Sequence, residues 1–465
     1  MFQTTIQPLS LQNFKANFHG ELVVPGDGAY DSTRRVWNGM INKYPALIAR
    51  CVDSADVVRS VEFARSQHLE VAVRGGGHSF VGNGTCEGGL VIDLSPMKRV
   101  QVDPVKRTAR AQAGLTLGEC LRETQQFGLG IPVGTASETG LAGLTLGGGT
   151  GWLMGKYGLT IDNLLAVEIV TADGRVLKAS ADEHPDLFWA VRGGSGNFGI
   201  VTTFEFRLHP VGTLLAGMVT YPVARAREVL RFYREFTRIA SDDLTAGVAL
   251  ASTPDGLPMV ALALCYCGPL TEGERLLEPI KTLGAPLVNL IRPMSYLEVI
   301  SMLEGIVPRG RHYYSKAHSL NTPSEELFDT MIKAHTARPS PWTQIVLQHV
   351  HGATSRIGPT ETAFALRKEY HSLQIMASWT EDEALEADTP IKWVRGLWTA
   401  TESFATGGTY INFLGSEEDE SVAVRASYGP NYERLVRVKN AYDPTNFFHL
   451  NHNIEPTGEK PEREG

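Results

Sequence analysis

A glycine-rich stretch with one histidine is the part of the sequence best suited to chemistry. The stretch VRGGGHSFVGNG, residues 73–84, contains Arg74, Gly75, Gly76, Gly77, His78, Ser79, Gly82 and Asn83. Consecutive exposed N–H groups of such a backbone can form a concave anion-binding site without a helix. The His78 imidazole adds a group that can bond to a ligand, or that can simply hydrogen-bond the loop backbone. The stretch therefore predicts a ligand-binding loop with one reactive side chain.

Two further glycine runs follow. The run GLAGLTLGGGTG, residues 140–151, comes after Thr139 and contains Gly140, Gly143, Gly147, Gly148 and Gly151. The run GSGNFG, residues 194–199, matches the dinucleotide fingerprint G-x-G-x-x-G. That fingerprint requires a strand before it and a helix after it, whereas here a helical pattern precedes it and a strand pattern follows. Glycines can also serve only as tight turns, but three runs close together favour phosphate binding by backbone N–H groups.

Regular elements must position these runs. PALIARC (45–51), SADVVRSVEFARSQHL (54–69) and VAVRG (71–75) predict a strand–helix–strand unit that leads into the first glycine stretch. Further strands are expected at 89–94, 98–103, 108–114 and 200–210, helices at 116–128 and 184–194, and a hairpin at 163–180. Beyond about residue 210 strands and amphipathic helices alternate without glycine clusters, which predicts a second α+β domain. A C-terminal helix and an Asp443-Pro444 turn are expected after it.

Composition and charge exclude several classes of protein. A chain of 465 residues is expected to form two or three domains. The formal net charge of -8 and the pI near 5.9 provide no basic field for a phosphate backbone, so nucleic acid is not an expected partner. The N-terminus lacks a secretory signal pattern and no apolar run reaches membrane-spanning length, which predicts a cytoplasmic protein without a membrane partner.

Four segments together resemble one known family. They are VRGGGHS (73–79), GLTLGGGTGWLMGKYGLTIDNL (143–164), DLFWAVRGGSGNFGIVT (186–202) and YDPTNFFHLNHNI (442–454). With these segments the sequence resembles the berberine-bridge-enzyme-like FAD-linked oxidases of the vanillyl-alcohol oxidase superfamily, over almost the whole chain. It is more similar to the bacterial members than to the plant enzymes. The resemblance implies an α+β, PCMH-type FAD-binding fold in two domains. Residues 1–209 and 415–465 would form the FAD-binding domain, and residues 210–414 an inserted antiparallel-sheet substrate domain.

The resemblance also implies how FAD is attached. In this family the loop histidine is bonded to the 8α-methyl group of the flavin, so His78 is the expected covalent link. Many members add a second link through a cysteine, but Ala136 stands at that position in GTASETG (134–140). A single link is therefore expected.

Further FAD contacts follow from the same resemblance. The backbone of residues 74–79 and 140–151, with Gly199, Ile200 and Val201, should bind the pyrophosphate and the flavin. Asn451 and Asn453 would share one face of an extended segment and contact the flavin ring or the substrate. Leu141 stands where side-chain bulk governs oxygen access to the flavin, which leaves oxidase and dehydrogenase activity both open.

Substrate residues are expected in the second domain and the C-terminal segment. Tyr410 and Asn412 would share one strand face, and Tyr428 lies in SYGPNY (427–432). Either tyrosine could take a substrate proton only if its neighbours lowered its pKa well below about 10, and a packed aromatic ring is the alternative. Further candidates for lining the substrate pocket are Tyr313, Tyr314, Gln348, His349 and His351. The two histidines have a spacing also used in metal sites, but no third ligand is close in sequence and no metal is expected.

These patterns predict a flavin-dependent oxidase. The enzyme would transfer hydride from a small organic substrate to FAD, with molecular oxygen as acceptor and hydrogen peroxide as product. Two alternatives stay open: a flavin-dependent oxygenase that inserts oxygen into a polyketide, and a flavin-binding protein that sequesters a ligand without turnover. The sequence identifies neither the substrate nor the oligomeric state.

Overall fold

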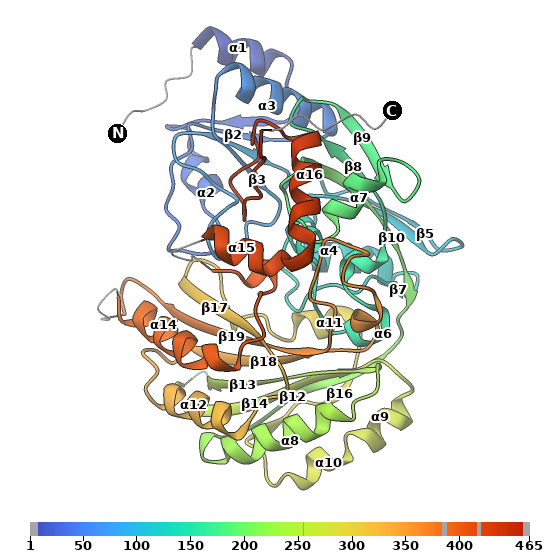
Figure 1. Cartoon of the computed structure of the whole chain (residues 1–465), viewed down its shortest axis with the longest axis vertical. Helices are drawn as coiled ribbons and strands as arrows, with labels where there is room; N and C mark the ends of the chain where they lie inside the picture. The colour runs from blue at the N-terminus through green and yellow to red at the C-terminus, as the bar shows by residue number, and fades with distance from the viewer. Residues whose placement is uncertain (1–7, 254, 384–387, 416–419, 459–465) are drawn as a thin grey trace.

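A four-stranded sheet forms the upper part of the molecule (Figure 1). The computed structural model describes residues 8–253, 255–383, 388–415 and 420–458. The strand order is β1 (Glu21–Val23), β2 (Leu47–Arg50), β4 (Leu90–Asp93) and β3 (Val71–Arg74). Strands β2 and β3 are each parallel to β4, and α3 (Ser54–Ser66) connects them. The predicted strand–helix–strand unit is confirmed, with β4 between its two strands, and the first glycine stretch leaves the carboxyl end of β3.

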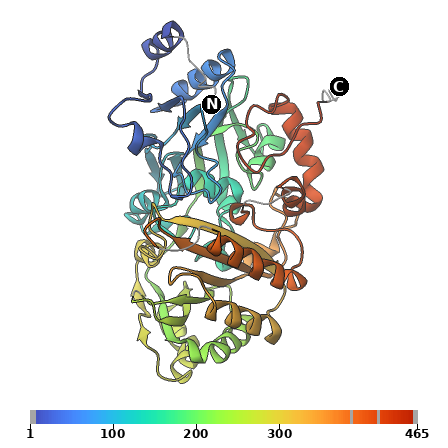
Figure 2. The ribbon, with the colours of Figure 1, turned by 90° about the vertical axis from the view of Figure 1, so that its left-hand side faces the viewer.

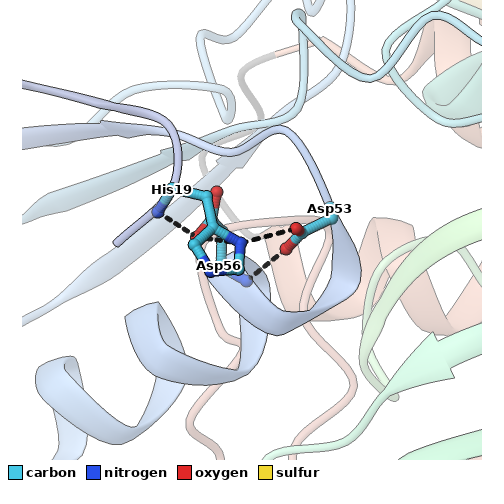
Figure 3. A group of neighbouring side chains, drawn as sticks. All are labelled: His19, Asp53 and Asp56. Atoms are coloured by element: carbon cyan, nitrogen blue, oxygen red, sulfur yellow. Dashed lines mark hydrogen bonds and ion pairs between the residues drawn. The ribbon is translucent and has the colours of Figure 1, made fainter. Parts of the chain in front are cut away.

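At the start of α3, Asp53 and Asp56 lie beside His19, which precedes β1 (Figure 3). Within the described ranges, this is the one group of three or more histidine, cysteine, aspartate or glutamate residues whose ligand atoms lie within 4.8 Å of one another. Asp53 caps the helix by accepting the Asp56 N–H at 2.9 Å, and it lies 2.8 Å from His19 Nδ1. The fully buried Asp56 carboxylate accepts the N–H groups of His19, Gly20 and Val52 at 2.8, 3.0 and 3.2 Å. Because these bonds use both Asp56 oxygens, the cluster serves as a helix cap that fixes the entry to β1.

A second sheet has five antiparallel strands. Its order is β5 (Val100–Asp103), β6 (Thr108–Gln112), β10 (Ile200–Arg207), β8 (Leu164–Val170) and β9 (Val176–Ser180). The predicted hairpin is confirmed as β8 and β9. The predicted helices are confirmed as α4 (Leu117–Gln125), which begins with a capping box, and α7 (Pro185–Val191). The run at 194–199 indeed follows a helix and precedes a strand, the reverse of the dinucleotide fingerprint.

An eight-stranded sheet crosses the lower part of the molecule (Figures 1 and 2). Seven strands lie in the order β15 (Val288–Asn289), β12 (Leu214–Pro222), β14 (Pro258–Tyr266), β13 (Leu244–Ser252), β18 (Gln344–Val350), β19 (Tyr370–Trp379) and β17 (His312–Leu320), and β16 (Arg292–Met294) also pairs with β12. Every pairing in this sheet is antiparallel. The predicted antiparallel sheet of the second region is therefore confirmed.

Helices cover one face of this sheet. These are α8 (Ala226–Arg238), α12 (Glu325–Thr336) and α14 (Thr389–Thr401), which contact β13, β14, β17, β18 and β19 (Figure 1). A second apolar core fills the space between these helices and the sheet, with Leu230, Phe328 and Leu347 fully buried in it. The other face of the sheet points toward the glycine runs. Among the described residues, no helix has both the length and the apolar character needed to cross a membrane.

The C-terminal helices return to the upper part of the molecule, where α16 packs against α7 (Figure 1). They are α15 (Glu420–Tyr428) and α16 (Tyr432–Tyr442), and the predicted C-terminal helix is thus confirmed. The remaining elements are short: α1 (Pro8–Ala16), α2 (Tyr30–Arg34), α5 (Leu141–Gly147), α6 (Met154–Tyr157), α9 (Leu270–Leu276), α10 (Glu278–Thr282), α11 (Tyr296–Ser301), α13 (Ala353–Arg356), β7 (Leu129–Gly130), β11 (His209–Pro210), and the 3-10 turns η1 (Thr160–Asn163), η2 (Val223–Arg225), η3 (Glu402–Phe404), η4 (Ile411–Phe413) and η5 (Gly429–Asn431).

Candidate active site

A cavity of about 890 Å³ lies between the glycine runs and the face of the eight-stranded sheet that the helices leave uncovered. Its lining comes from the loop after β3, residues 134–152, residues 195–201, strands β13, β14, β18 and β19, and residues 410–414 and 448–452. Segments that are far apart in the sequence thus form one concave site of the size typical of small-molecule and cofactor pockets.

The first two glycine runs touch each other through their backbones. A Cβ atom on Gly76 would lie 2.4 Å from Gly140 N, and one on Gly140 would lie 2.3 Å from Gly76 N. Atoms cannot approach so closely without contact strain, so both positions require glycine. The predicted cofactor-binding residues that line this wall are Arg74, Gly75, Gly76, Gly77, His78, Ser79, Asn83, Thr139, Gly140 and Gly143. They form one continuous wall of mostly bare backbone, which we name the glycine wall.

Four predicted cofactor-binding glycines lie behind this wall: Gly82, Gly147, Gly148 and Gly151. The run 140–151 is not an open loop throughout, because α5 occupies its first half. A Cβ atom on Gly147 would lie 2.2 Å from Asn412 Oδ1, and one on Gly151 would lie 1.7 Å from Val133 O. These glycines are needed for close packing, and the prediction that they contact the ligand is not supported.

Four buried polar atoms of cavity-lining residues have no hydrogen-bond partner among the described residues: Arg74 Nη1, His78 Nε2, Trp152 Nε1 and Asn451 Oδ1. Buried polar groups in native proteins are nearly always hydrogen-bonded, so these atoms indicate that polar ligand atoms belong beside them. The Arg74 side chain is fixed by Asp93, whose Oδ2 accepts from Arg74 Nη2 at 2.9 Å within the buried interior. A fixed guanidinium, bare backbone and ring-nitrogen donors fit the phosphates and the polar ring edge of FAD.

His78 is held in a form suited to bonding. Burial, and after it the positive charge of Arg309, lower the pKa of His78 to about 4. The imidazole is therefore neutral at pH 7 and keeps a nitrogen lone pair. Its ring stacks on Trp37 with centroids 5.0 Å apart.

A buried ion pair brings the C-terminal segment to the cavity. Lys439 Nζ donates to Asp443 Oδ2 at 2.7 Å and to the carbonyls of Asn197 and Phe448 at 2.9 Å. The Asn197 amide in turn donates to His452 O at 3.2 Å. Since all of these groups are buried, this network ties two lining segments together. The residues so joined are Ser195, Gly196, Gly199, Ile200 and Val201 on one side, and Phe448, Leu450, Asn451 and His452 on the other.

Tyr410 faces the cavity with its hydroxyl surrounded by N–H donors. Its Oη accepts the Gly149 N–H at 2.9 Å and the Asn412 amide at 2.8 Å, and the same amide donates to Leu144 O at 3.1 Å. The strand predicted for Tyr410 to Asn412 is wrong, because this segment forms the turn η4, which directs both side chains toward α5. Burial raises the pKa of Tyr410 above its ordinary value of 10.0, and the N–H donors oppose that rise.

Tyr428 is placed away from the cavity. Its ring is 2% exposed within the main apolar core, and its hydroxyl has no partner among the described residues. Burial raises its pKa well above 10.0. The end of α15 packs inward instead of facing the sheet, so the expectation that Tyr428 takes a substrate proton is not supported.

The sheet side of the cavity is a regular array of side chains, which we name the sheet wall. Because alternate residues of a strand share a face, every second residue of each strand points into the cavity. The register opposes Gln348 to Ser372, Val346 to Gln374 and Gln344 to Met376 across β18 and β19.

Small residues occupy the next two strands of the sheet wall. Gly247 lies opposite Ala263, and Ala249 lies opposite Ala261, across β13 and β14. These four positions form a shallow recess beside the amide-bearing strands. None of the side chains of the sheet wall is charged. Among the residues that the structure describes, Asp255 is the one carboxylate that lines the cavity, and it lies at the tip of the β13–β14 hairpin.

Several predicted substrate residues lie elsewhere. Gln348 and Asn412 line the cavity, whereas Leu141, Tyr313, Tyr314, His349 and His351 do not, nor does the predicted flavin contact Asn453. His349 points to the opposite face from Gln348, and its ring stacks on His351 at 4.4 Å and on His371 at 4.7 Å. The two histidines do share a side, but it is the side that faces away from the cavity.

The same alternation separates the two tyrosines of β17. Tyr314 lies on the helix side, where its hydroxyl accepts from Arg395 Nε at 3.0 Å. Tyr313 lies on the cavity side but behind the Trp37 ring, at a centroid distance of 4.0 Å. Leu141 is fully buried in the main core.

Other residues that were not predicted from the sequence also line the cavity. Extending the alternation from Gln348 would have identified Gln344 and Val346. Trp152 lies inside one of the quoted motifs and could have been named from it. Trp37 and Gln374 gave no local signal, because only the tertiary fold brings them to the cavity.

Comparison with known proteins identifies the kind of site. Residues 45–180 match the family described as FAD binding domain, and residues 409–455 match the family described as berberine and berberine like. The chain is 31% identical to an FAD-linked oxidoreductase of Dictyostelium discoideum, over 96% of this chain and 97% of that protein. It is 30% identical to (R)-6-hydroxynicotine oxidase of Paenarthrobacter nicotinovorans, over 97% of this chain and 98% of that protein.

Solved structures agree with these sequence relatives. The crystal structure of 6-hydroxy-D-nicotine oxidase from Arthrobacter nicotinovorans superposes with a TM-score of 0.86 at 30% identity, covering 94% of this chain and 98% of that one. The structure of BBE-like 1 from Physcomitrella patens gives a TM-score of 0.85 at 25% identity, covering 94% and 97%. The glycine wall lies mostly within the matched FAD-binding region, and Tyr410, Asn412 and Asn451 lie within the second matched region.

Proposed function

Since the chain belongs to the berberine-bridge-enzyme-like FAD-linked oxidoreductases, we propose that it oxidises an uncharged small organic molecule with an FAD that is bonded to His78. One observation carries the proposal: His78 lines the cavity beside the bare backbone of Gly75 to Gly77. Its imidazole is neutral, and its buried Nε2 has no hydrogen-bond partner among the described residues. Ala136 lines the same cavity and offers no thiol, so the link is single.

The two walls have different proposed roles, one in binding the cofactor and the other in binding the substrate. Arg74 and the glycine wall would hold the phosphates of FAD, and Asn451 Oδ1 would accept a hydrogen bond from the bound cofactor. FAD, when bound, supplies the acceptor for a hydride, and molecular oxygen is the proposed final acceptor, giving hydrogen peroxide. The sheet wall holds the substrate, and its amides are suited to hydroxyl or carbonyl groups.

Tyr410 is the proposed proton acceptor. Two N–H bonds to its Oη, from Gly149 and from Asn412, stabilise a phenolate oxygen. The lowered pKa expected for a tyrosine base is not found, because burial keeps the pKa of Tyr410 above 10.0. The basic form is therefore scarce at neutral pH. Below that pKa its population grows about tenfold with each pH unit.

The absence of charge on the sheet wall supports an uncharged substrate. A cationic amine buried against the sheet wall would have no carboxylate partner there, and burying an unpaired charge is costly. Asp255 at the hairpin tip could meet a polar group only at the end of the cavity.

The proposal is tested by precipitating the purified protein with acid and mapping any flavin that stays with the pellet. We expect a yellow pellet, with flavin found only on the peptide that contains His78. A colourless pellet with unmodified His78 would refute the covalent link.

A second measurement separates oxidation from the alternatives. With labelled oxygen gas, an oxidase places the label in hydrogen peroxide, whereas an oxygenase places it in the organic product. Failure of every candidate substrate to bleach the flavin without oxygen would leave the ligand-sequestering alternative.

A further inference from the structure

Residues 37–39 join the histidine loop to the segment that enters β17. Trp37 N donates to Gly77 O at 3.0 Å, and Gly310 N donates to Trp37 O at 2.9 Å. Gly39 N donates to Arg311 O at 2.8 Å. The residue before His78 is therefore linked through Trp37 to a part of the chain more than two hundred residues away.

Asn38 strengthens this connection. Its amide nitrogen donates to Phe80 O at 2.7 Å and to Tyr313 O at 2.9 Å, and its amide oxygen accepts the Tyr313 N–H at 3.0 Å. Asn38 is 1% exposed. The backbone is thus held on both sides of His78, at Gly77 and at Phe80.

The rings of His78, Trp37 and Tyr313 form a stack beside these backbone bonds. The His78 and Trp37 rings lie 5.0 Å apart at 19°, and the Trp37 and Tyr313 rings lie 4.0 Å apart at 12°. Trp37 Nε1 donates to Val307 O at 3.1 Å, and the Tyr313 hydroxyl donates to Pro308 O at 2.6 Å. Since Trp37 and Tyr313 are buried and bonded to backbone, their rings cannot turn, and Trp37 presents a fixed flat surface to the imidazole.

We propose that Trp37 is a positioning residue for flavin attachment, which holds the His78 ring in the orientation from which one of its nitrogens reaches the 8α carbon. The inference rests on the proposed function, in which His78 is the attachment site. Attachment forms one N–C bond and breaks one imidazole N–H bond and one methyl C–H bond. The two electrons and two protons released pass to the flavin and then to molecular oxygen, which becomes hydrogen peroxide.

The rate of attachment depends on the orientation of the imidazole. A reacting pair held near 3–3.5 Å with aligned orbitals reacts much faster than a freely rotating pair. Without the Trp37 surface the imidazole can rotate about its terminal torsion, which is broad for histidine. Fewer molecules then present the nitrogen correctly, so attachment slows while FAD can still bind to the glycine wall.

The test follows attachment itself. Full-length protein produced under riboflavin limitation is incubated with FAD in air, and acid-stable flavin on the protein is measured over time, beside total bound FAD. We expect Trp37→Leu to bind FAD but attach it at least tenfold more slowly. Trp37→Phe, which restores a flat aromatic face, should recover most of the rate.

A matched control uses another tryptophan. Trp393 on α14 also donates its Nε1 to a carbonyl, that of Ala334 at 3.0 Å, but on the helix side of the sheet. Trp393→Leu should attach FAD at the rate of the unaltered protein. Equal slowing in Trp393→Leu and Trp37→Leu would overturn the proposal, as would an unchanged rate in Trp37→Leu.

Two further outcomes are informative. If Trp37→Leu does not fold, Tyr313→Leu removes the outer ring without touching His78, and a rate equal to that of the unaltered protein would then refute the proposal. If the unaltered protein binds FAD but never forms acid-stable flavin, the covalent link is wrong and the role of Trp37 fails with it.

Discussion

One wall of the cavity consists mainly of backbone, and the other consists of side chains. The glycine wall consists of backbone from Gly75 to Gly77 and around Gly140, brought so close that a Cβ atom on either loop would meet backbone of the other. The sheet wall consists of side chains at every second position of β13, β14, β18 and β19.

The difference shows what each wall can recognise. Backbone N–H groups stay the same under every substitution except proline, so a wall of backbone suits a ligand that is constant, such as FAD. A sheet wall can exchange any inward side chain without altering the strand pairing, so it suits a ligand that differs between relatives. Tyr410 connects the cavity to the glycine run behind the glycine wall, because it lines the cavity and its hydroxyl accepts the Gly149 N–H.

The largest effect is expected at that junction. Tyr410→Phe removes the proposed proton acceptor and should lower kcat by about a hundredfold or more, while covalent FAD stays at its usual level. The unaltered enzyme should gain activity with rising pH, about tenfold per unit, because the pKa of Tyr410 is raised above 10.0 and the deprotonated form is the active one. The measurement is turnover against pH in both proteins.

Tyr428→Phe is the control, since Tyr428 is another fully buried tyrosine whose hydroxyl has no partner among the described residues. It should change kcat by less than about twofold. A flat pH profile in the unaltered enzyme would contradict the assignment of Tyr410 as the base.

A smaller effect is expected in the glycine wall. In Gly140→Ala the new Cβ atom would lie 2.3 Å from Gly76 N, so the two loops must separate at a cost of about 1–3 kcal/mol. Bound FAD per protein should fall about tenfold, measured by absorbance after gel filtration. Gly212→Ala places its Cβ atom in open space, and normal FAD content is expected there. Equal FAD contents would show that the close approach of the loops is not needed.

A substitution in the sheet wall should change substrate binding and leave the FAD content unchanged. Ala261→Leu fills the recess between Ala249 and Ala263 and should raise KM about tenfold for a substrate that fills the recess, with FAD content unchanged. The exposed Leu257 of the same hairpin provides a control, Leu257→Ala, which should leave both quantities as they were. Loss of FAD in Ala261→Leu would break the distinction between the two walls.

The histidines on the face of the sheet that points away from the cavity should make the stability of the protein depend on pH. Burial, and after it the neighbouring imidazoles, lower the pKa of His349 to about 4 and that of His371 to about 3. Below the ordinary value of 6.5 the unfolded chain binds protons that the folded chain does not, so the free energy of unfolding falls as pH falls from 6.5 toward 4.

Urea unfolding at pH 7 and pH 5 measures this effect. The unaltered protein should lose stability on acidification, and His371→Gln should lose about 2 kcal/mol less, because one buried imidazole no longer titrates. An identical loss in both proteins would show that these histidines are not the cause.

The sequence by itself determined the glycine wall and its histidine. Gly76 and Gly140 lie so close together that no side chain fits at either position. Only glycine meets this steric requirement, so the sequence itself shows where the backbone must be bare. The regular elements around it, such as α3, α4 and the β8–β9 hairpin, also followed from local periodicity and turn residues. The expected ligand contact of Gly82, Gly147, Gly148 and Gly151 is not supported by the cavity lining, because glycine serves close packing as well as ligand contact and a sequence does not distinguish the two.

The tertiary structure alone decided the sheet wall. Strand spacing placed His349 and His351 on one face, but which face looks into the cavity depends on the helices that cover the other one. Likewise, Trp37 meets His78 and Tyr313 only through pairings between distant segments. Contacts of that kind depend on the register of the whole sheet, which no short stretch of sequence specifies.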